Sequence, residues 1–235
     1  MRFARRGDGT IVALENFTLS DGTVIPAGTA GGYIESSKNL SQFGTAWVLP
    51  GGYVTGNAYV SGDALIGGSA IISGDARIQG KACVESGEVY GNARVADEAY
   101  ITGVNTKIYG DAVVYGNATV SDGAYVFEKA RVYGNSLVSG AQARISASAR
   151  IFGHASVYCL VTCTNILYSP SVSGCVETDD QSQVLDKARV SGCIILKNSI
   201  LDGDAVLYGD LLIEDQHISD AGYVTNCPET KCCPD

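Results

Sequence analysis

The sequence predicts an all-β fold, a triangular parallel β-helix built from stacked coils of about 18 residues. Three observations predict it: a repeat with a period of six residues, a Val or Ile that returns once per repeat, and turn residues between repeats. The pattern is clear from GNAYVS at Gly56 and GDALIG at Gly62, and it continues with few breaks to GHASVY at Gly153. Three units of six residues, joined by corners, close one coil.

Elementary chemistry assigns the positions inside each repeat. A spacing of six gives the recurring Val or Ile no helical face, so these side chains point to a shared core from successive short strands. The small residue two positions earlier also faces inward, because a larger side chain would not fit near the corner. Gly and Asn at the turn tolerate positive φ at low cost. The inward residues of the first units are Val60, Ile66, Ile72, Ile78 and Val84, with Ala58, Ala64, Ala70, Ala76 and Ala82.

This pattern resembles the hexapeptide-repeat family of left-handed parallel β-helices. The small residues that lie four positions after each aliphatic one, such as Ala64 after Val60, carry the resemblance. It covers residues 31–226, or roughly ten coils. The segment GGYIESSKNLSQFGTAWV, which starts at Gly31, is similar to the opening segment of uncharacterised hexapeptide-repeat proteins of enteric bacteria and their prophages. Those proteins are often named acyltransferases on their fold alone.

The chain divides into three regions. Residues 1–30, with turn signals at Gly7-Asp8-Gly9 and Asp21-Gly22, predict an N-terminal hairpin that caps the open strand edge of the solenoid. Residues 31–226 form the predicted left-handed parallel β-helix. Residues 227–235 form a Cys-rich tail that contains Cys227, Cys232 and Cys233.

Charge and composition exclude several classes of protein. The 16 basic and 25 acidic residues give a net charge of −9, and the excess acids lie mostly in the last quarter. A duplex DNA binder needs a basic face, so we expect no duplex DNA as partner. No run of about 18 apolar residues predicts a membrane span, and no export signal is visible. We therefore expect a cytoplasmic protein of a bacterial host cell with reduced thiols.

The outward residues sort onto three faces if every third unit lies on the same face. The first face carries Arg77, Arg94, Arg131 and Arg150, accompanied by Tyr115, Tyr133 and Phe152. The second carries Tyr53, Tyr90, Tyr109, Tyr125 and Phe127. The third is mostly small or polar, with Leu65, Glu85, Thr102, Thr119, Ser121 and Ser139.

Two interpretations of these ladders stay open. Arginines beside aromatic rings suit an anionic planar ligand such as a nucleotide, because guanidinium groups bind phosphate in bidentate fashion and rings stack on bases. Tyr and Arg are also favoured in interfaces, and the family resemblance implies association around a threefold axis. We assign ligand binding to the first face and the oligomer interface of a homotrimer to the second.

Catalytic equipment is sparse. Acyltransferases with this fold use a histidine as general base, and the chain holds only His154 and His217, both interpreted as corner residues. The long loop that typically closes over the cofactor in those enzymes is not visible. A zinc site with three histidine ligands is improbable with two histidines, and the terminal cysteines match no zinc signature. Cys159, Cys163, Cys175 and Cys193 are expected to pack as small core residues. We expect no metal and no cofactor.

The sequence therefore favours a non-catalytic binding protein, encoded by a phage or prophage. It would sequester an anionic nucleotide-like small molecule, or block a host defence protein, through the faces and inter-subunit clefts of a trimer. An acyl-CoA-dependent acyltransferase with His154 or His217 as base is one alternative. A structural phage protein is the other, because fold alone does not fix function.

Overall fold

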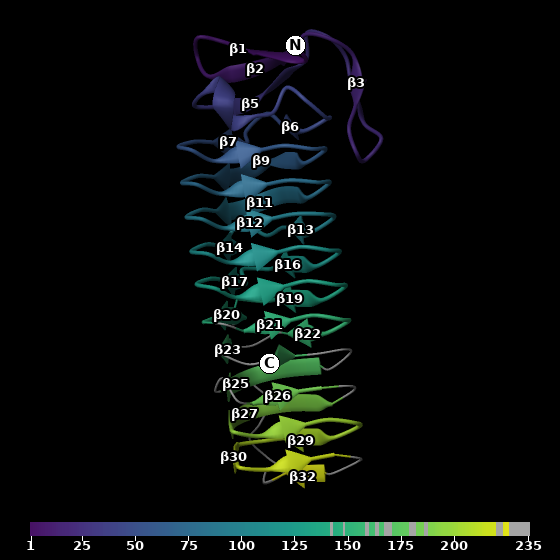
Figure 1. The fold of residues 1–235 in the computed structure, drawn as a ribbon, viewed down its shortest axis with the longest axis vertical. Coiled ribbons are helices and arrows are strands. Elements are labelled where there is room, and N and C mark those ends of the chain that lie inside the picture. The colour runs from purple at the N-terminus through teal and green to yellow at the C-terminus, as the bar shows by residue number, and fades with distance from the viewer. Residues whose placement is uncertain are drawn as a thin grey trace.

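The structure, a computed structural model, is a long stack of coils that begins with antiparallel strands at its N-terminal end (Figure 1). No helix among the residues it describes is long and apolar enough to cross a membrane. The described residues are 1–141, 143–147, 149–157, 160–162, 165–166, 171–178, 182–185, 188–219 and 223–225.

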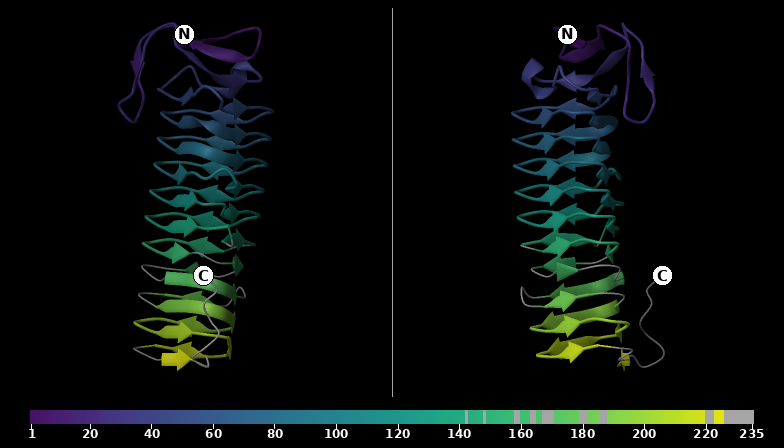
Figure 2. Two further views of the ribbon diagram at one scale, coloured as in Figure 1. Left: turned by 180° about the vertical axis from the view of Figure 1, so that it is seen from behind. Right: turned by 45° about the vertical axis from the view of Figure 1, so that its right-hand side comes forward.

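The N-terminal region is built from hairpins. Strands β1 (Phe3–Arg5) and β2 (Thr10–Ala13) pair in antiparallel fashion, and β2 pairs in the same sense with β5 (Ala30–Ile34). The end of β5 then pairs in parallel with β7 (Tyr53–Val54), so β5 is the strand on which the solenoid starts. A second hairpin of β3 (Phe17–Thr18) and β4 (Val24–Ile25) lies along the side of the first coils (Figures 1 and 2). A single turn of 3-10 helix spans Ser37–Asn39.

Ten strands, one from each successive coil, form a fully parallel sheet that we call the arginine face. Its register partners Val60, Ile78, Val95 and Val114 are 17 to 19 residues apart, so the predicted length of the coil is confirmed. The strands are β8 (Tyr59–Val60), β10 (Arg77–Ile78), β12 (Arg94–Val95), β15 (Val113–Val114), β18 (Arg131–Val132), β21 (Arg150–Ile151), β24 (Asn165–Ile166), β26 (Gln183–Val184), β28 (Ile200–Leu201) and β31 (His217–Ile218).

The other two faces share one sheet of 20 strands, because four long strands run through the corner between them. These long strands are β9 (Leu65–Ile72), β11 (Cys83–Val89), β25 (Ser171–Thr178) and β27 (Arg189–Lys197). The hydroxyl face takes their first halves with β6 (Trp47–Val48), β13 (Tyr100–Ile101), β16 (Thr119–Ser121), β19 (Leu137–Ser139), β22 (Ser156–Val157), β29 (Val206–Tyr208) and β32 (Tyr223–Thr225). The aromatic face takes their second halves with β7, β14 (Lys107–Ile108), β17 (Tyr125–Val126), β20 (Arg144–Ser146), β23 (Leu160–Thr162) and β30 (Leu211–Glu214).

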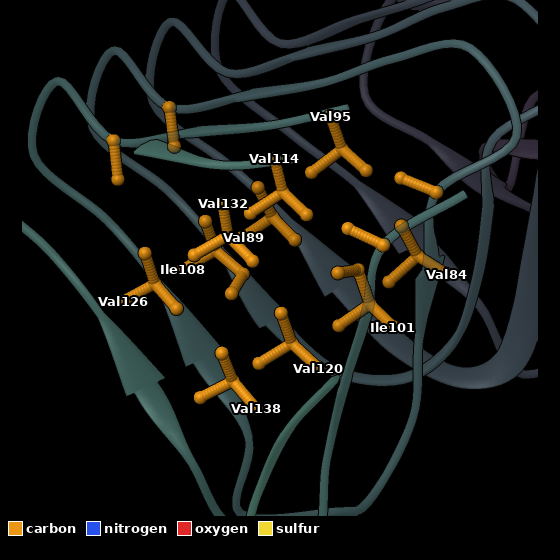
Figure 3. Close-up of a cluster of buried hydrophobic side chains, with 14 of the residues drawn as sticks. Val84, Val89, Val95, Ile101, Ile108, Val114, Val120, Val126, Val132 and Val138 are labelled. Carbon is orange, nitrogen blue, oxygen red and sulfur yellow. The ribbon is translucent and has the colours of Figure 1, made fainter. Parts of the chain in front are cut away.

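The core runs along the axis of the stack. In the coils from Val54 to Val157 the aliphatic residue of each unit and the Ala two positions before it are buried, as the sequence predicts, and in Figure 3 the Val and Ile side chains of the central coils point toward one another. Polar replacements at the Ala position bond to the backbone. The buried Ser136 hydroxyl donates to the Tyr133 carbonyl at 2.9 Å, and that of Thr106 donates to the Thr102 carbonyl at 2.6 Å. Hydroxyls fit there because the backbone satisfies them.

The corners require glycine for two reasons. At Gly62 the backbone φ is +71°, which is in the left-handed region. A Cβ added there would lie 2.9 Å from both the N and the O atoms of Gly80, one coil away. Glycine at a corner is therefore required both by the left-handed backbone conformation and by the close contact with the next coil.

The β3–β4 hairpin covers part of a solenoid face. Trp47 occupies an outward position on the hydroxyl face, yet it is fully buried because Phe17 packs edge-on against it at 5.3 Å between ring centroids. The Arg2 guanidinium lies 5.0 Å from the Phe17 ring centroid and donates to the Ser41 and Ala46 carbonyls. The N-terminal region thus protects a side of the first coils in addition to their open edge.

A matched pair of substitutions tests the core. Val114→Ala removes a fully buried side chain and leaves a cavity, so we expect it to lower the free energy of unfolding by about 2 kcal/mol or more. Val104→Ala makes the same change at a side chain that is 71% exposed, and we expect little effect. Urea unfolding followed by circular dichroism measures both; equal losses would contradict this assignment of the core.

Candidate ligand-binding face

The predicted arginine ladder lies on one face, in two pairs. The first residue of each strand on the arginine face points outward, and Arg77 is the register partner of Arg94. Arg131 is in the same way the partner of Arg150. Val113 lies between the two pairs, as partner of both Arg94 and Arg131. All four arginines are exposed.

These arginines have no charged partner among the described residues. Within the described ranges of the chain, none of the four guanidinium groups forms an ion pair or a hydrogen bond. Neighbouring strands of a sheet are about 4.8 Å apart, so the two members of a pair repel each other. An anion held between them would relieve this repulsion and would find two forked donors.

A column of aromatic rings runs beside the arginines. Tyr115 stacks on Tyr133 with ring centroids 4.7 Å apart, and Tyr133 stacks on Phe152 at 4.8 Å, with an interplanar angle of 6° in both pairs. These rings lie two residues after Val113, Arg131 and Arg150, directly after the ends of β15, β18 and β21, so they point outward from the same face. Burial in the stack raises the pKa of Tyr133, and the positive charges of Arg150 and Arg131 oppose that rise.

The aromatic face holds the second predicted set. Tyr90, Tyr109 and Phe127 stack with centroids 5.0 Å apart in each pair, and Tyr125 packs edge-on against Tyr109. Tyr53 lies on the same face but outside this stack. It packs against Tyr33 with ring centroids 5.7 Å apart.

Lys107 and Arg144 on the aromatic face, unlike the four arginines of the arginine face, have partners. The Lys107 ammonium lies 3.1 Å from the Glu88 carboxylate, and that hydrogen bond raises the pKa of Lys107. The Arg144 guanidinium lies 3.6 Å from the ring centroid of Tyr125 in a cation–π contact. The repeat pattern alone does not predict these two contacts, although Arg144 occupies the same position in its repeat as Arg131.

The hydroxyl face satisfies its own polar groups. Tyr100 and Thr102 both donate to the Glu85 carboxylate, which lowers the pKa of Glu85 and raises that of Tyr100. Ser121 and Ser139 donate to Asp122 and lower its pKa in the same way. These polar side chains of the hydroxyl face are therefore hydrogen-bonded to one another.

The two histidines lie far apart. His154 is exposed in the corner after β21, as predicted, whereas His217 begins strand β31, so its interpretation as a corner residue is wrong. The His217 Nε2 atom lies 2.7 Å from Asp202 Oδ2 at an exposed position. Four strand steps separate β21 from β31, or about 19 Å along the stack. The two imidazoles cannot act on one substrate atom.

The cysteines offer no metal site in the described part of the chain, where no three potential ligands lie close enough to hold an ion. Cys175 and Cys193 occupy register-partner positions on β25 and β27. The remaining predicted positions, Cys159, Cys163, Cys227, Cys232 and Cys233, lie outside the described residues. Cys83 is a half-buried free thiol on the hydroxyl face.

Comparison with known families gives one result. The model of a repeat family matches the chain. That family is described as the YdcK β-solenoid repeat, and the match covers residues 107–122, which include β14, β15 and β16. No curated protein matches the sequence. The match agrees with the stacked coils and supports a β-solenoid repeat protein.

The Cys83 thiol is expected to be unreactive in the folded protein. Burial, aided by the negative charges of Glu85 and Asp21, raises its pKa to about 11, so little thiolate exists at pH 8. We expect brief alkylation with iodoacetamide at pH 8 to label Cys83 about a hundredfold more slowly in the native protein than in urea. Peptide mass spectrometry measures both rates, and equal labelling would contradict the burial of this side chain.

Proposed function

We propose that this protein is a non-catalytic binding protein that takes an anionic planar small molecule, such as a nucleotide, on its arginine face. The observation that carries the proposal is the contrast between the faces. Lys107 and Arg144 on the aromatic face have partners, while the four arginines of the arginine face have none within the described residues. Arg131 and Arg150 lie directly beside a stack of rings, and Arg94 lies one coil beyond the end of that stack.

Electrostatics favours a small anion over a nucleic acid duplex. The net charge of −9 repels an extended polyanion, whereas four guanidinium groups on one face create a local positive field. A phosphate between two stacked arginines receives forked hydrogen bonds from both. An aromatic ring beside it supplies a stacking surface for a base.

The proposal includes a homotrimer of hexapeptide-repeat β-helices that associates through the aromatic face. Stacked Tyr and Phe side chains present a large amphipathic area, and the charges among them are already paired, so their burial costs less. This assignment leaves the arginine face accessible. The opening segment resembles prophage-encoded proteins, which supports a phage or prophage origin. In that setting the protein would sequester a nucleotide-like signal of the host or block a host defence protein.

Acyl transfer from acyl-CoA is the alternative supported by one contact. The carboxylate of Asp202 orients the His217 imidazole, as a partner residue orients a general base. The geometry supports binding better than acyl transfer, because His217 is exposed to solvent. The unpaired arginines on the same sheet suit anion binding, which requires no general base. A structural role in a phage particle has no contact that favours it.

Ligand capture is expected to depend on the arginine pairs. The double variant Arg94→Ala/Arg131→Ala removes one guanidinium from each pair, and we expect it to weaken nucleoside phosphate binding by at least about tenfold. Calorimetric titration with nucleoside phosphates, and native mass spectrometry for a ligand that copurifies, measure the effect.

The control has the same charge change. Arg6→Ala/Lys38→Ala removes two exposed cations of the N-terminal region, and we expect affinity within about threefold of the parent protein. If this control variant lost as much affinity as the Arg94→Ala/Arg131→Ala variant, binding would be a property of net charge, and the proposed site would be wrong.

The trimer is tested on the aromatic face. We expect Tyr53→Glu combined with Tyr109→Glu to give monomers, because the carboxylates would be buried without partners at the interface. Tyr59→Glu, on the arginine face, is the control and should stay trimeric. Native mass spectrometry gives the subunit count, circular dichroism verifies folding, and a monomeric parent protein would contradict the trimer.

A further inference from the structure

We propose that the ligand site on the arginine face is a single ring-sized slot over Ala96, with Tyr115 as its stacking surface and with Arg94 and Arg77 as its phosphate clamp. This inference rests on the proposed function and specifies its location, its stoichiometry of one ligand per chain and its ligand class. The ligand is a planar ring that bears one phosphate group.

The ring stack of the arginine face ends at Tyr115. In the two coils that follow Tyr115 toward the C-terminus, the column continues with Tyr133 and then Phe152. In the preceding coil, drawn above it in Figure 1, the same position holds Ala96, since Val95 is the register partner of Val114. The Ala96 side chain is a methyl group, so the column lacks a ring at this level.

One face of the Tyr115 ring is thus uncovered by aromatic or cationic groups. Among the described residues, the guanidinium–ring contacts are Arg2 over Phe17 and Arg144 over Tyr125, and neither involves Tyr115. The coil above Ala96 places Gln79 in the same column, because Ile78 pairs with Val95. A ring that replaced the missing side chain would stack on Tyr115 and lie below the amide of Gln79, which can donate to and accept from its edge.

The upper arginine pair lies at the level of this slot. Arg94 precedes Ala96 by two residues and Arg77 precedes Gln79 by two, so both point outward beside the empty position. A phosphate attached to the ring would lie between these two guanidinium groups. Val113 bounds the clamp on its other side, next to Tyr115, and carries no charge.

The lower arginine pair has no equivalent slot. Arg131 and Arg150 lie beside Tyr133 and Phe152, which fill the ring positions of their own coils. These two rings cover each other, so a base cannot insert there without opening the stack. The two pairs therefore have different roles, and the upper pair holds the ligand.

The carboxylates that follow Ala96 in the chain face the corner beyond it, while those of Asp75 and Asp111, two residues before Arg77 and Val113, accept hydrogen bonds from Asn57 and Asn92. Asp97 Oδ2 accepts a hydrogen bond from the Gly116 backbone N–H at 3.2 Å, and Glu98 is ion-paired with Lys81 at 3.1 Å. Both residues follow Ala96, while the arginines precede it. A bound ligand would thus direct its phosphate toward the arginines and the opposite edge of its ring toward the corner.

The decisive variant fills the slot with a tyrosine, the residue that the next two coils carry at this position. Ala96→Tyr adds a ring on top of Tyr115, in the position that Tyr115 itself holds over Tyr133, so we expect a folded protein. The probe is adenosine 5′-monophosphate, titrated by calorimetry into the full-length protein. We expect one site per chain, and a loss of affinity of at least about tenfold in Ala96→Tyr, because the added ring occupies the stacking surface.

Matched controls separate the slot from the rest of the molecule. Ser73→Tyr adds a ring next to Tyr90, at the N-terminal end of the ring stack on the aromatic face, since Ile72 pairs with Val89. This variant should leave the affinity for adenosine 5′-monophosphate unchanged. Arg94→Ala should weaken binding at least about tenfold, while Arg150→Ala, with the same charge change, should stay within about threefold. Tyr115→Phe should retain binding, and Tyr115→Ala should lose it.

Dissected probes test the ligand class. Adenosine lacks the phosphate and ribose 5-phosphate lacks the ring, so each should bind at least about tenfold more weakly than adenosine 5′-monophosphate. Equal affinity of ribose 5-phosphate would show that the ring is not stacked and would overturn the slot.

The outcomes distinguish the slot from the general proposal. If Ala96→Tyr and Arg94→Ala bound like the parent while Arg94→Ala/Arg131→Ala lost binding, the ligand would lie beside the lower pair, and the slot would be wrong while the proposed function stood. If the parent protein bound none of the three probes at millimolar concentration, both proposals would be overturned.

Discussion

Parallel, in-register stacking is the constraint on which the whole molecule depends. Each residue of a coil lies about 4.8 Å from its counterpart in the next coil, so each inward column must repeat small and branched aliphatic side chains. Val60, Ile78 and Val95 illustrate this repetition in the buried column of one face. The same geometry forces outward residues into columns, and any residue type that recurs at the coil period then meets its own kind.

Outward columns are stable where neighbouring side chains attract each other. Where neighbouring side chains repel each other, the column indicates a binding site for a group from outside the chain. Stacked rings attract, as Tyr109 does with Phe127, and Lys107 finds Glu88 one coil away. At the corners an Asn beside an Asp, such as Asn92 with Asp111, gives a hydrogen bond between coils. Adjacent arginines such as Arg77 and Arg94 repel each other, and this repulsion is the reason that the proposed function places an anion between them.

The N-terminal region solves a problem that stacking creates. The first coil has no preceding neighbour, so its edge and its outward Trp47 would be left to solvent. Antiparallel pairing of β2 with β5 covers the edge, and Phe17 of the β3–β4 hairpin covers the indole. The same chain thus changes from antiparallel to parallel pairing within β5, whose end pairs with β7.

The sequence by itself determined the coils, the core and the membership of each face, because a strict six-residue period leaves one register that buries Val, Ile and Ala together. It also placed Arg94 and Tyr115 on one face. The tertiary structure decided which groups have partners: Arg144 over Tyr125, His217 beside Asp202, and Trp47 beneath the hairpin. Those contacts depend on side-chain direction and on the length of each coil, which varies from 15 to 20 residues between register partners and is not visible in an average repeat.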